Sequence, residues 1–382
     1  MMQTMPEQHP AARLKRAEHG VKAAFFALFR VFLKKGQPDR SLLDGSQIKR
    51  VLLLRPETKL GDMVISLPVI DTLKRHYPHI KISILCSPGN VGLIKDDPRF
   101  EMIFLYRKNI FRDIAEVRRI RREQYDCVLD LLCDDSVTSL VLSQYCTPRK
   151  PRLGVGKQQF ADYYDFNRFN GVDESKHIVN NTLHLLDAFG IDTGDENGHA
   201  DVYLSENDRD IADRFVASVN DGRSQGPLLG FNVSAGTATR RWAQQKQAKL
   251  IEKILAHDSS ARFVIICTPA DRDQGRKLCD RIPDKLHLVP DHLSITAVSA
   301  ILKRLDLLIS PDTSLVHIAR SFRVPVVSMY PGVRKNLVLW RPFGQDDGFV
   351  VAKHPNNIFD ITVEQVFDAY RQLMASQKKV EN

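Results

Sequence analysis

Residues 50–62 read RVLLLRPETKLGD, and this stretch decides the fold class of the chain. Its four consecutive apolar residues, 51–54, predict a short strand that is buried on both faces, as in a parallel sheet. A glycine turn at Gly61 and Asp62 follows, and residues 63–77 then show a helical pattern with an early proline. A buried strand, a turn and a helix in this order predict a doubly wound α/β domain.

The same alternation continues on both sides of a polar linker. Strand-like runs before the linker cover 80–86, 101–106 and 127–132, and a basic helical pattern covers 110–122. The linker is the polar stretch 205–226, which carries a helical pattern and ends in DGRSQG. Strand-like runs recur after it at 228–233, 263–266, 307–309 and 324–329. We therefore predict two Rossmann-like domains that face each other across a cleft, at 46–222 and 223–382, behind an extension of residues 1–45.

Composition narrows the class of protein. The 382 residues are 43% hydrophobic and 26% charged, which is typical of a globular chain long enough for two domains. The six cysteines have no CxxC spacing and lie mostly in apolar runs, so we expect reduced thiols and no zinc site. The sequence contains neither GxxxxGK[ST] nor GxGxxG, which disfavours a P-loop kinase and a nicotinamide-dependent dehydrogenase. The net charge of +9 suits an anionic partner, but no helix-turn-helix, zinc or RNP pattern supports nucleic-acid binding.

Residues 11–36 form a basic, amphipathic stretch ahead of the first domain. They carry seven Lys/Arg against one acid, and bulky apolar residues recur among them at helical spacing. This pattern predicts an interfacial helix on an anionic leaflet. A signal peptide is disfavoured because Arg30 interrupts the apolar run and no small-residue cleavage site follows. A helix that docks on the protein's own surface is the alternative, and no run approaches the roughly 18 apolar residues of a membrane span.

Polar motifs follow three of the predicted strands, and the carboxyl ends of parallel strands line the cleft of such a fold. The first motif is Gly61 with Asp62. Taken alone, Asp62 would most simply be a helix N-cap that binds the first amides of the following helix.

The second motif, residues 234–242, reads SAGTATRRW. Small and hydroxyl-bearing residues such as Ser234 and Thr237 leave backbone amides free to approach an anion, and two arginines, including Arg240, suit phosphate oxygens. The motif predicts a phosphate cradle, and the alternative is a polar loop with surface arginines.

The third motif, residues 310–317, reads SPDTSLVH and opens a helix directly after a buried strand. Hydroxyls and amides at a helix N-terminus bind anions readily. His317 falls one turn after Thr313, on the same helix face. The alternatives are Asp312 as a bare N-cap and His317 as a satisfied core histidine.

Together with residues 55–67 and 125–131, these motifs resemble the successive signatures of the ADP-heptose:lipopolysaccharide heptosyltransferases, glycosyltransferase family 9. The order and spacing match over about residues 49–344, and the Asp-Thr-x-x-x-His block from Asp312 to His317 is the most specific element. The resemblance implies a GT-B fold, with an N-terminal acceptor domain and a C-terminal nucleotide-sugar domain. It also implies an inverting transfer of heptose from ADP-heptose to the inner core of lipopolysaccharide, with no metal and no cofactor. Combined with residues 11–36, it implies a cytoplasmic enzyme that is peripheral to the bacterial inner membrane.

The resemblance also implies roles for individual residues. Asp62 matches the general base that would take the proton of the acceptor hydroxyl. Arg240 occupies a position where the family usually has lysine, and its charge would offset that of the departing ADP. The remaining donor-site residues that the resemblance implies are Ser234, Thr237, Asp273, Asp312, Thr313, Ser314 and His317, of which Asp273 would lie near the ribose. No motif marks the acceptor-binding residues.

Ser314 is the clearest departure, because the family commonly has glycine there. A side chain at this position narrows the approach to the diphosphate or the sugar, so a related transferase with another nucleotide sugar or surface glycan acceptor is one alternative. A non-catalytic GT-B scaffold that binds glycan is another, although such a scaffold needs no base opposite an anion site. The basic helix at 112–122 is expected to face a phosphorylated core or the membrane, or to be a solvated surface.

Overall fold

The computed structural model describes residues 33–36, 43–194, 198–220 and 226–380. The predicted interfacial helix at 11–36 therefore lies outside the described residues, except for its last four. Within the described ranges, no helix combines the length and the apolar character that crossing a bilayer requires.

Six parallel strands form the first sheet, in the order β3-β2-β1-β4-β5-β6. Their bounds are β1 Arg50–Arg55, β2 Lys81–Cys86, β3 Phe100–Leu105, β4 Cys127–Asp130, β5 Arg152–Val155 and β6 Phe166–Arg168. The central strand β1 is buried from Val51 to Arg55, as its apolar run predicts. Leu53 of β1 lies between Ile84 of β2 and Leu129 of β4 in the register of the sheet.

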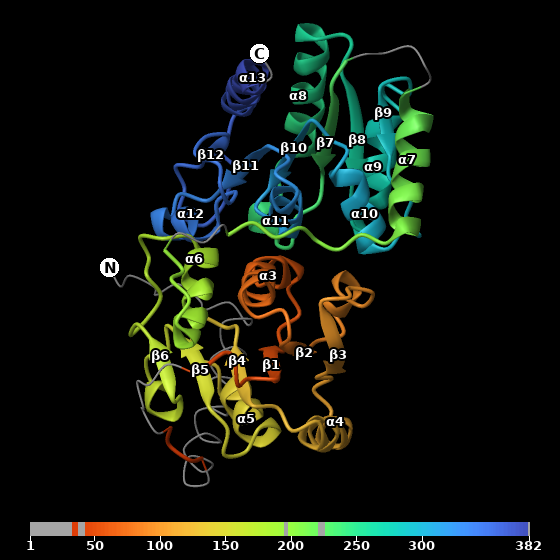
Figure 1. The fold of residues 1–382 in the computed structure, drawn as a ribbon. Coiled ribbons are helices and arrows are strands. Elements are labelled where there is room, and N and C mark those ends of the chain that lie inside the picture. Colours follow the sequence, from red (N-terminus) through yellow and green to blue (C-terminus); the bar gives the residue numbers. More distant parts are fainter. Residues whose placement is uncertain (1–32, 37–42, 195–197, 221–225, 381–382) are drawn as a thin grey trace, which may run out of the picture.

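Helices cover both faces of this sheet (Figure 1). The face toward the second sheet carries α2 Leu60–Val64, α3 Leu67–His76, α6 Ile178–Leu183 and the 3-10 helices Val91–Leu93 and His184–Phe189. The opposite face carries α4 Ile110–Arg122 and α5 Val137–Cys146, and a 3-10 turn spans Ala161–Tyr163. Residues of β1 alternate between the two layers, because Leu53 packs with α3 and Leu54 packs with Ile120 of α4.

The second sheet repeats the same connectivity, in the order β12-β11-β10-β7-β8-β9 with all strands parallel. Its strands are β7 Leu228–Asn232, β8 Arg262–Ile266, β9 Leu286–Leu288, β10 Leu307–Pro311, β11 Val326–Tyr330 and β12 Phe349–Val351. Its helices are α8 Gln244–His257, α9 Arg272–Cys279, α10 Ile295–Leu302, α11 Ser314–Ser321, α12 Arg334–Trp340 and α13 Val363–Val380, with 3-10 turns at Ala238–Arg240 and Pro269–Asp271. The prediction of two Rossmann-like α/β domains is confirmed.

In each sheet the strand order reverses between the first and the fourth strand. These switch points lie between β1 and β4 and between β7 and β10, and ligands of doubly wound sheets bind at the carboxyl ends of such strands. The topology therefore points to the loops after β1, β4, β7 and β10.

Helix α7, Glu206–Asn220, precedes the predicted boundary between residues 222 and 223, yet it packs against α10 beside the second sheet (Figure 1). The Oδ1 atom of Asp208 accepts hydrogen bonds from the Ser294 hydroxyl at 3.3 Å and from the Thr296 hydroxyl at 3.0 Å. The boundary itself stays a prediction, and α7 belongs spatially with the second sheet.

A contact near α6 joins the two domains. His177, the N-cap of α6, lies with Nε2 at 2.9 Å from the carbonyl oxygen of Arg341, and its Nδ1 accepts the amide of Val179 at 3.1 Å. The ring of Phe343 lies 4.9 Å, centroid to centroid, from both His177 and His199. These rings form a joint between the domains.

The six cysteines are free thiols. Cys86, Cys127, Cys133 and Cys146 are buried, as their apolar surroundings in the sequence predict, while Cys267 and Cys279 are half-buried. Burial raises the pKa of Cys86 and of Cys146 to about 12, so these thiols stay protonated at neutral pH.

Candidate active site

Asp62 lies in α2, directly after β1, with only 9% of its side chain exposed. Its Oδ2 is 3.7 Å from Nη2 of Arg55 and 3.8 Å from Nζ of Lys59. Lys59, not Asp62, holds the N-cap position of α2, and no side chain caps that helix. The alternative of Asp62 as an N-cap is therefore wrong, and its carboxylate is held by cations beside the switch point.

Arg55, the last residue of β1, ties the Asp62 loop to the next strand. Its side chain is 5% exposed, and Nη1 donates a hydrogen bond of 2.6 Å to the carbonyl of Leu131, just beyond β4. Because β1 and β4 flank the switch point, this one guanidinium fixes both loops there. The sequence places Arg55 at the end of a strand, and only the fold shows its contact with Asp62.

Glu57 is a second carboxyl at this point that the sequence analysis missed. Burial raises the pKa of Glu57, the charge of Arg55 lowers it, and a hydrogen bond with Asp62 raises it again, with a resulting pKa of about 7. Its carbonyl accepts hydrogen bonds of 2.7 Å from both Ser87 and Asn90, which hold the loop in place. Below about pH 7 the Glu57 carboxyl is therefore protonated beside Asp62.

The second and third predicted motifs meet through Asn232, the last residue of β7. Its Nδ2 donates to the hydroxyls of Ser310 at 2.9 Å and Thr313 at 3.1 Å, and its Oδ1 accepts the amide of Ser234 at 3.0 Å. Thr313 is the N-cap of α11, whose N-terminus opens toward these hydroxyls. Asn232 lies inside a predicted strand, so its bridging role was not visible in the sequence.

Arg240 closes this arrangement from the other side. Its Nη1 lies 2.9 Å from Oδ2 of Asp312, and its side chain is 40% exposed whereas that of Asp312 is 11% exposed. Burial raises the pKa of Asp312, and the charge of Arg240 counteracts this effect. Thr237 lies on the exposed part of the same loop, where its hydroxyl is 3.0 Å from that of Thr239.

His317 and Ser314 bring the first and third motifs together across the domain interface. A Cβ atom on Gly61 would lie 2.9 Å from Cδ2 of His317 and 3.5 Å from Cα of Ser314, so α2 packs directly on α11. Only glycine permits this approach. Burial lowers the pKa of His317, although the nearby carboxylates of Asp312 and Asp62 raise it. His317 is thus buried between the two halves of the site.

Asp273 lies apart from this cluster, because its side chain is 88% exposed on α9 and pairs with Arg276 on the same helix. Asp271 occupies the more central place, since it forms an ion pair with Arg241 and accepts a 3.0 Å hydrogen bond from the Thr268 hydroxyl. Burial raises the pKa of Asp271, but hydrogen bonds from Ser234, Arg241 and Thr268 lower it more strongly, and the resulting pKa is below its usual value. The sequence analysis missed Asp271, two positions from the acid that it selected.

Comparison with known proteins identifies the family of this chain. Residues 114–369 match the sequence profile of glycosyltransferase family 9 (heptosyltransferase). The chain belongs to glycosyltransferase family 9.

Relatives of similar length support this family. The lipopolysaccharide core heptosyltransferase OpsX of Haemophilus influenzae is 20% identical over 278 residues, which are 71% of this chain and 76% of that protein. The putative lipopolysaccharide heptosyltransferase 4 of Escherichia coli K12 is 22% identical over 358 residues, which are 92% and 94% of the two chains. The predicted family and enzyme class, a glycosyltransferase of the heptosyltransferase type, are confirmed.

Solved structures share the fold. A family 9 glycosyltransferase from Veillonella parvula superimposes with a TM-score of 0.72 at 18% identity, over 88% of this chain and 99% of that one. The ADP-heptose lps heptosyltransferase II of Escherichia coli has a TM-score of 0.65 at 16% identity, over 86% and 99%. The predicted GT-B fold is therefore confirmed.

A buried network supports the first half of the site in this family 9 enzyme. Nζ of Lys157 lies 2.8 Å from Oδ2 of Asp130, and both side chains are fully buried. The same oxygen accepts a 2.5 Å hydrogen bond from the hydroxyl of Tyr164. Lys157 also donates to the carbonyls of Leu132 and Asp134 at 2.7 Å each. These contacts of Lys157, together with the contact of Arg55, hold the loop after β4 in place.

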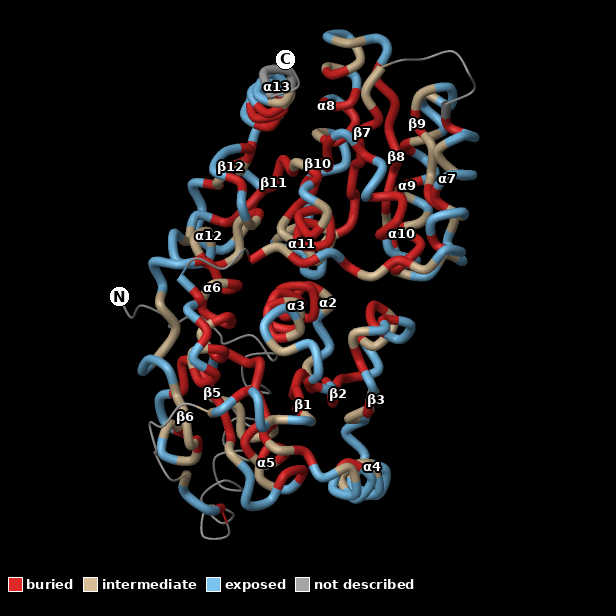
Figure 2. The backbone as a smooth tube through the Cα atoms, in the orientation of Figure 1, coloured by how far each residue is buried: buried red, intermediate tan, exposed pale blue. Residues whose placement is uncertain are grey.

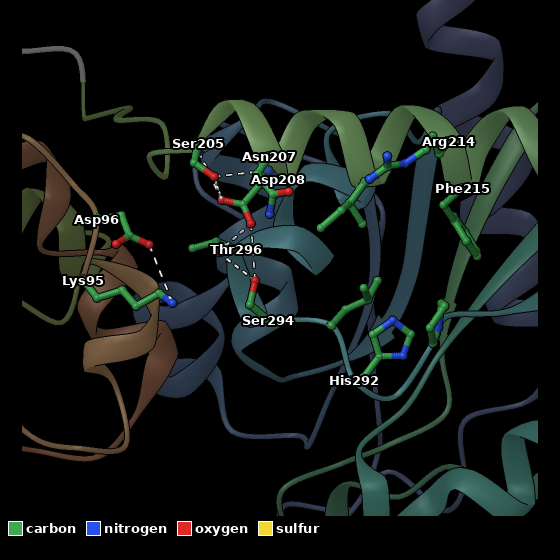
Figure 3. Close-up of a pocket in the computed structure, with 13 residues that line it drawn as sticks. Lys95, Asp96, Ser205, Asn207, Asp208, Arg214, Phe215, His292, Ser294 and Thr296 are labelled. Atoms are coloured by element: carbon green, nitrogen blue, oxygen red, sulfur yellow. Dashed lines mark hydrogen bonds and ion pairs between the residues drawn. The ribbon is translucent and has the colours of Figure 1, made fainter.

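A cavity of ≈ 590 Å³ opens elsewhere along the domain interface of this glycosyltransferase (Figure 3). The first domain contributes Lys95 and Asp96, and the second contributes residues of α7 and of the segment before α10, such as Arg214, His292 and Ser294. None of the predicted site residues lines this cavity. The cavity and the cluster around Asp62 are thus two separate features of the interface.

Proposed function

We propose that this protein transfers heptose from ADP-heptose to the inner core of lipopolysaccharide, with inversion at the anomeric carbon and without a metal ion. Membership of family 9 supports the class of reaction. One observation supports the mechanism: Gly61 packs on His317 and Ser314, so helix α2, which carries Asp62, lies against the first turn of α11.

The base lies on the first-domain side. As the acceptor hydroxyl oxygen forms a bond with the anomeric carbon, Asp62 accepts its proton, and the bond from that carbon to the diphosphate oxygen breaks on the opposite side. Arg55 and Lys59 keep the Asp62 carboxylate in place, at 3.7 and 3.8 Å. One displacement with the nucleophile and the leaving group on opposite faces inverts the configuration.

The leaving group is received on the second-domain side. ADP departs with the electron pair of the broken bond, and its diphosphate needs positive charge and hydrogen-bond donors. Arg240, the hydroxyl of Thr313 and the amides at the start of α11 supply both. Because an arginine and a helix N-terminus provide this charge, the donor set itself requires no metal. Arg240 acts by charge alone, since arginine does not give up its proton.

The remaining donor-site residues stay part of the proposal. Ser234, Thr237 and Ser314 would contact the phosphates or the sugar, and Asp312 and His317 would orient the loop that holds them. Asp273 stays a candidate for the ribose, and we add Asp271, whose carboxylate is anchored by Arg241 and Thr268.

Domain roles and location follow from the same proposal. The first domain, 46–222, would bind the acceptor, and the second, 223–382, would bind the nucleotide sugar. Residues 11–36 would hold the enzyme on the cytoplasmic face of the inner membrane through their cationic, amphipathic pattern.

The direct test incubates the full-length protein with ADP-heptose and a heptose-deficient lipopolysaccharide core and measures release of ADP. Release that depends on the acceptor is the expected result. No release above background with any core acceptor would reject the proposed transfer.

Ser314 favours a second candidate function, a transferase that uses another nucleotide sugar. Its Cα lies against Gly61 at the domain interface, where the Ser314 side chain adds bulk next to the proposed sugar position. A thermal-unfolding screen of nucleotide sugars separates the two candidates, because the true donor raises the melting temperature most. The largest rise with a sugar other than ADP-heptose would favour the second candidate.

A further inference from the structure

Helix α4 presents large apolar side chains to solvent. Six large hydrophobic residues are exposed in the part of the chain that the structure describes, and three of them lie in the first five residues of α4: Ile110 at 67%, Phe111 at 82% and Ile114 at 42% exposed. A fourth, Tyr145, is 40% exposed on α5, which packs against α4. Figure 2 shows α4 mainly in the colour of exposed residues. Such a concentration of exposed apolar side chains marks an interaction surface.

Cations accompany these apolar residues on the same helix face. Residues 107–122 hold seven Lys/Arg and two acids. Phe111, Ile114 and Arg118 follow one another at spacings of three and four, which places them on one side of the helix, and Arg122 continues that row. All four are exposed. The surface therefore has an apolar end and a cationic end.

The two acids of α4 offset only part of this positive charge, and both also serve local structure. Asp113 accepts the backbone amides of Arg107 and Asn109, each at 2.8 Å. Glu116 accepts the amide of Leu105 at 2.9 Å, and its side chain is 15% exposed. Its Oε2 also lies 3.8 Å from Nη1 of Arg119, so Arg118, Arg121 and Arg122 carry the net positive charge at the far end of the helix.

We propose that α4 is a membrane contact of this protein, in which Ile110, Phe111 and Ile114 insert at the level of the headgroups while Arg118, Arg121 and Arg122 bind anionic lipid. Basic residues next to apolar anchors on one helix face suit such an interface. The inference extends the proposed role of residues 11–36, and it does not depend on the transfer reaction.

The place where the basic N-terminal stretch reaches the fold supports this assignment. Leu33 packs with Leu140 of α5, and Lys34 exchanges two hydrogen bonds with Gln144 of α5, at 2.9 and 2.8 Å. The described end of the stretch, residues 33–36, therefore lies on α5, the helix that packs against α4.

Charge also identifies the occupant of the α4 surface. The stretch 11–36 carries seven cations and one acid, so it would repel α4 rather than cover it. A second copy of the same surface would be repelled in the same way. An anionic leaflet attracts both elements together. Figure 1 shows α4 on the side of the first sheet that faces away from the second domain, so membrane contact there leaves the domain interface accessible.

The experiment measures how the full-length protein partitions onto vesicles of phosphatidylglycerol and phosphatidylethanolamine, by co-sedimentation at low and at raised ionic strength. One variant, Phe111→Ser with Ile114→Ser, removes the apolar anchors. A second variant, Arg118→Gln with Arg122→Gln, removes the charge. Each is expected to lower the partition coefficient about tenfold. The charge variant should also depend less on ionic strength than the unaltered protein, although residues 11–36 keep their own cations.

Matched controls keep the comparison strict. Phe359→Ser removes an apolar side chain that is 56% exposed on the second domain. Arg209→Gln with Arg276→Gln removes two exposed arginines from α7 and α9. Both controls should bind vesicles like the unaltered protein. The α4 variants should also keep turnover with a water-soluble core fragment, because α4 lies on the opposite face of the sheet from α2.

Three outcomes would overturn the proposal. The α4 variants could bind anionic vesicles as well as the unaltered protein does, or the unaltered protein could bind phosphatidylcholine vesicles equally well. The third is a protein that binds no vesicles while its α4 variants change the oligomeric state in gel filtration. Vesicle binding through α4 in a protein that releases no ADP would reject only the proposed transfer.

Discussion

The two halves of the candidate site are built in opposite ways. On the first domain, the Asp62 carboxylate is 9% exposed and held by two cations and the Glu57 carboxyl. On the second domain, the neutral hydroxyls of Ser310 and Thr313 and a 40% exposed Arg240 lie near the N-terminus of α11. The first half thus holds its carboxylate in a fixed position, whereas the second half presents hydrogen-bonding groups and a partly exposed cation.

This difference teaches which half must change when ligand binds. Arg55 already ties Asp62 to the loop after β4, so the proposed base needs no rearrangement. Arg240 instead pairs with Asp312, and the diphosphate of the proposed donor would have to replace that carboxylate as its partner. The charge that neutralises Asp312 is thus the same charge that the proposed leaving group needs.

Removing the fixed half should have the largest effect. Asp62→Asn keeps the shape of the side chain but cannot take a proton, so we expect turnover to fall by about 10²–10⁴-fold. ADP affinity and the melting temperature should change little, as judged by calorimetry and thermal unfolding. Asp210→Asn, at an exposed position of α7, serves as the control. Joint loss of ADP binding and folding would instead assign Asp62 a structural role.

Altering the second half of the site should reduce turnover less. Arg240→Ala removes the charge that meets the diphosphate, so we expect kcat to fall about 100-fold. Arg240→Lys restores a cation and should recover most of that loss, which steady-state kinetics can measure. An equal loss of kcat in both variants would show that the second half of the site requires the planar guanidinium and not its charge.

Forcing the halves apart tests whether they work as a unit. Gly61→Ala places a Cβ 2.9 Å from His317, and we expect a cost of about 1–3 kcal/mol in unfolding free energy together with roughly tenfold slower turnover. Denaturant unfolding and kcat measure the two effects. Gly236→Ala is the matched control for stability, since its added Cβ would meet no atom within 4 Å. A Gly61→Ala protein with unchanged stability and turnover would show that the close approach is dispensable.

The raised pKa of Glu57 predicts the smallest effect, on stability. The pKa of Glu57 is raised from 4.5 to about 7, so the folded protein holds the proton of this carboxyl more tightly than the unfolded chain does. The contribution of Glu57 to the unfolding free energy should therefore fall as the pH rises from about 4.5 to about 7. Glu57→Gln should remove that fall and gain about 1–2 kcal/mol at pH 8, a value limited by solvent screening at this partly exposed carboxyl.

Unfolding free energies of the unaltered protein and the variant across pH 4–8 provide the test. The two proteins should agree at the acid end, diverge between about pH 4.5 and 7, and keep a constant difference above neutrality. Parallel curves would show that Glu57 does not hold this proton, and Glu206→Gln at an exposed position of α7 controls for the loss of one charge.

The central strands could be predicted from the sequence because they are buried apolar runs. Residues 228–233 correspond to β7 Leu228–Asn232, and 80–86 correspond to β2 Lys81–Cys86. The short strands β5, β6, β9 and β12 were missed. Each has only three or four residues, which is too short for an apolar run to stand out from the loops around it.

The candidate site shows a similar limit. Loops after strands could be located from local patterns, which is why Asp62 and the Asp312 block were selected. Glu57, Asn232 and Asp271 gain their roles only from burial and from partners in other loops. The contact between Gly61 and His317 spans the two domains, so no local pattern contains it.

The joint of His177 and Phe343 has a consequence for acid resistance. Burial is the largest cause that lowers the pKa of His177, to about 3, so its ring stays neutral and keeps both hydrogen bonds. The unfolded chain, by contrast, takes up this proton near pH 6.5. The contribution of His177 to the unfolding free energy therefore decreases from about pH 6.5 downward, without loosening the joint. The two domains should keep their relative alignment until the chain unfolds.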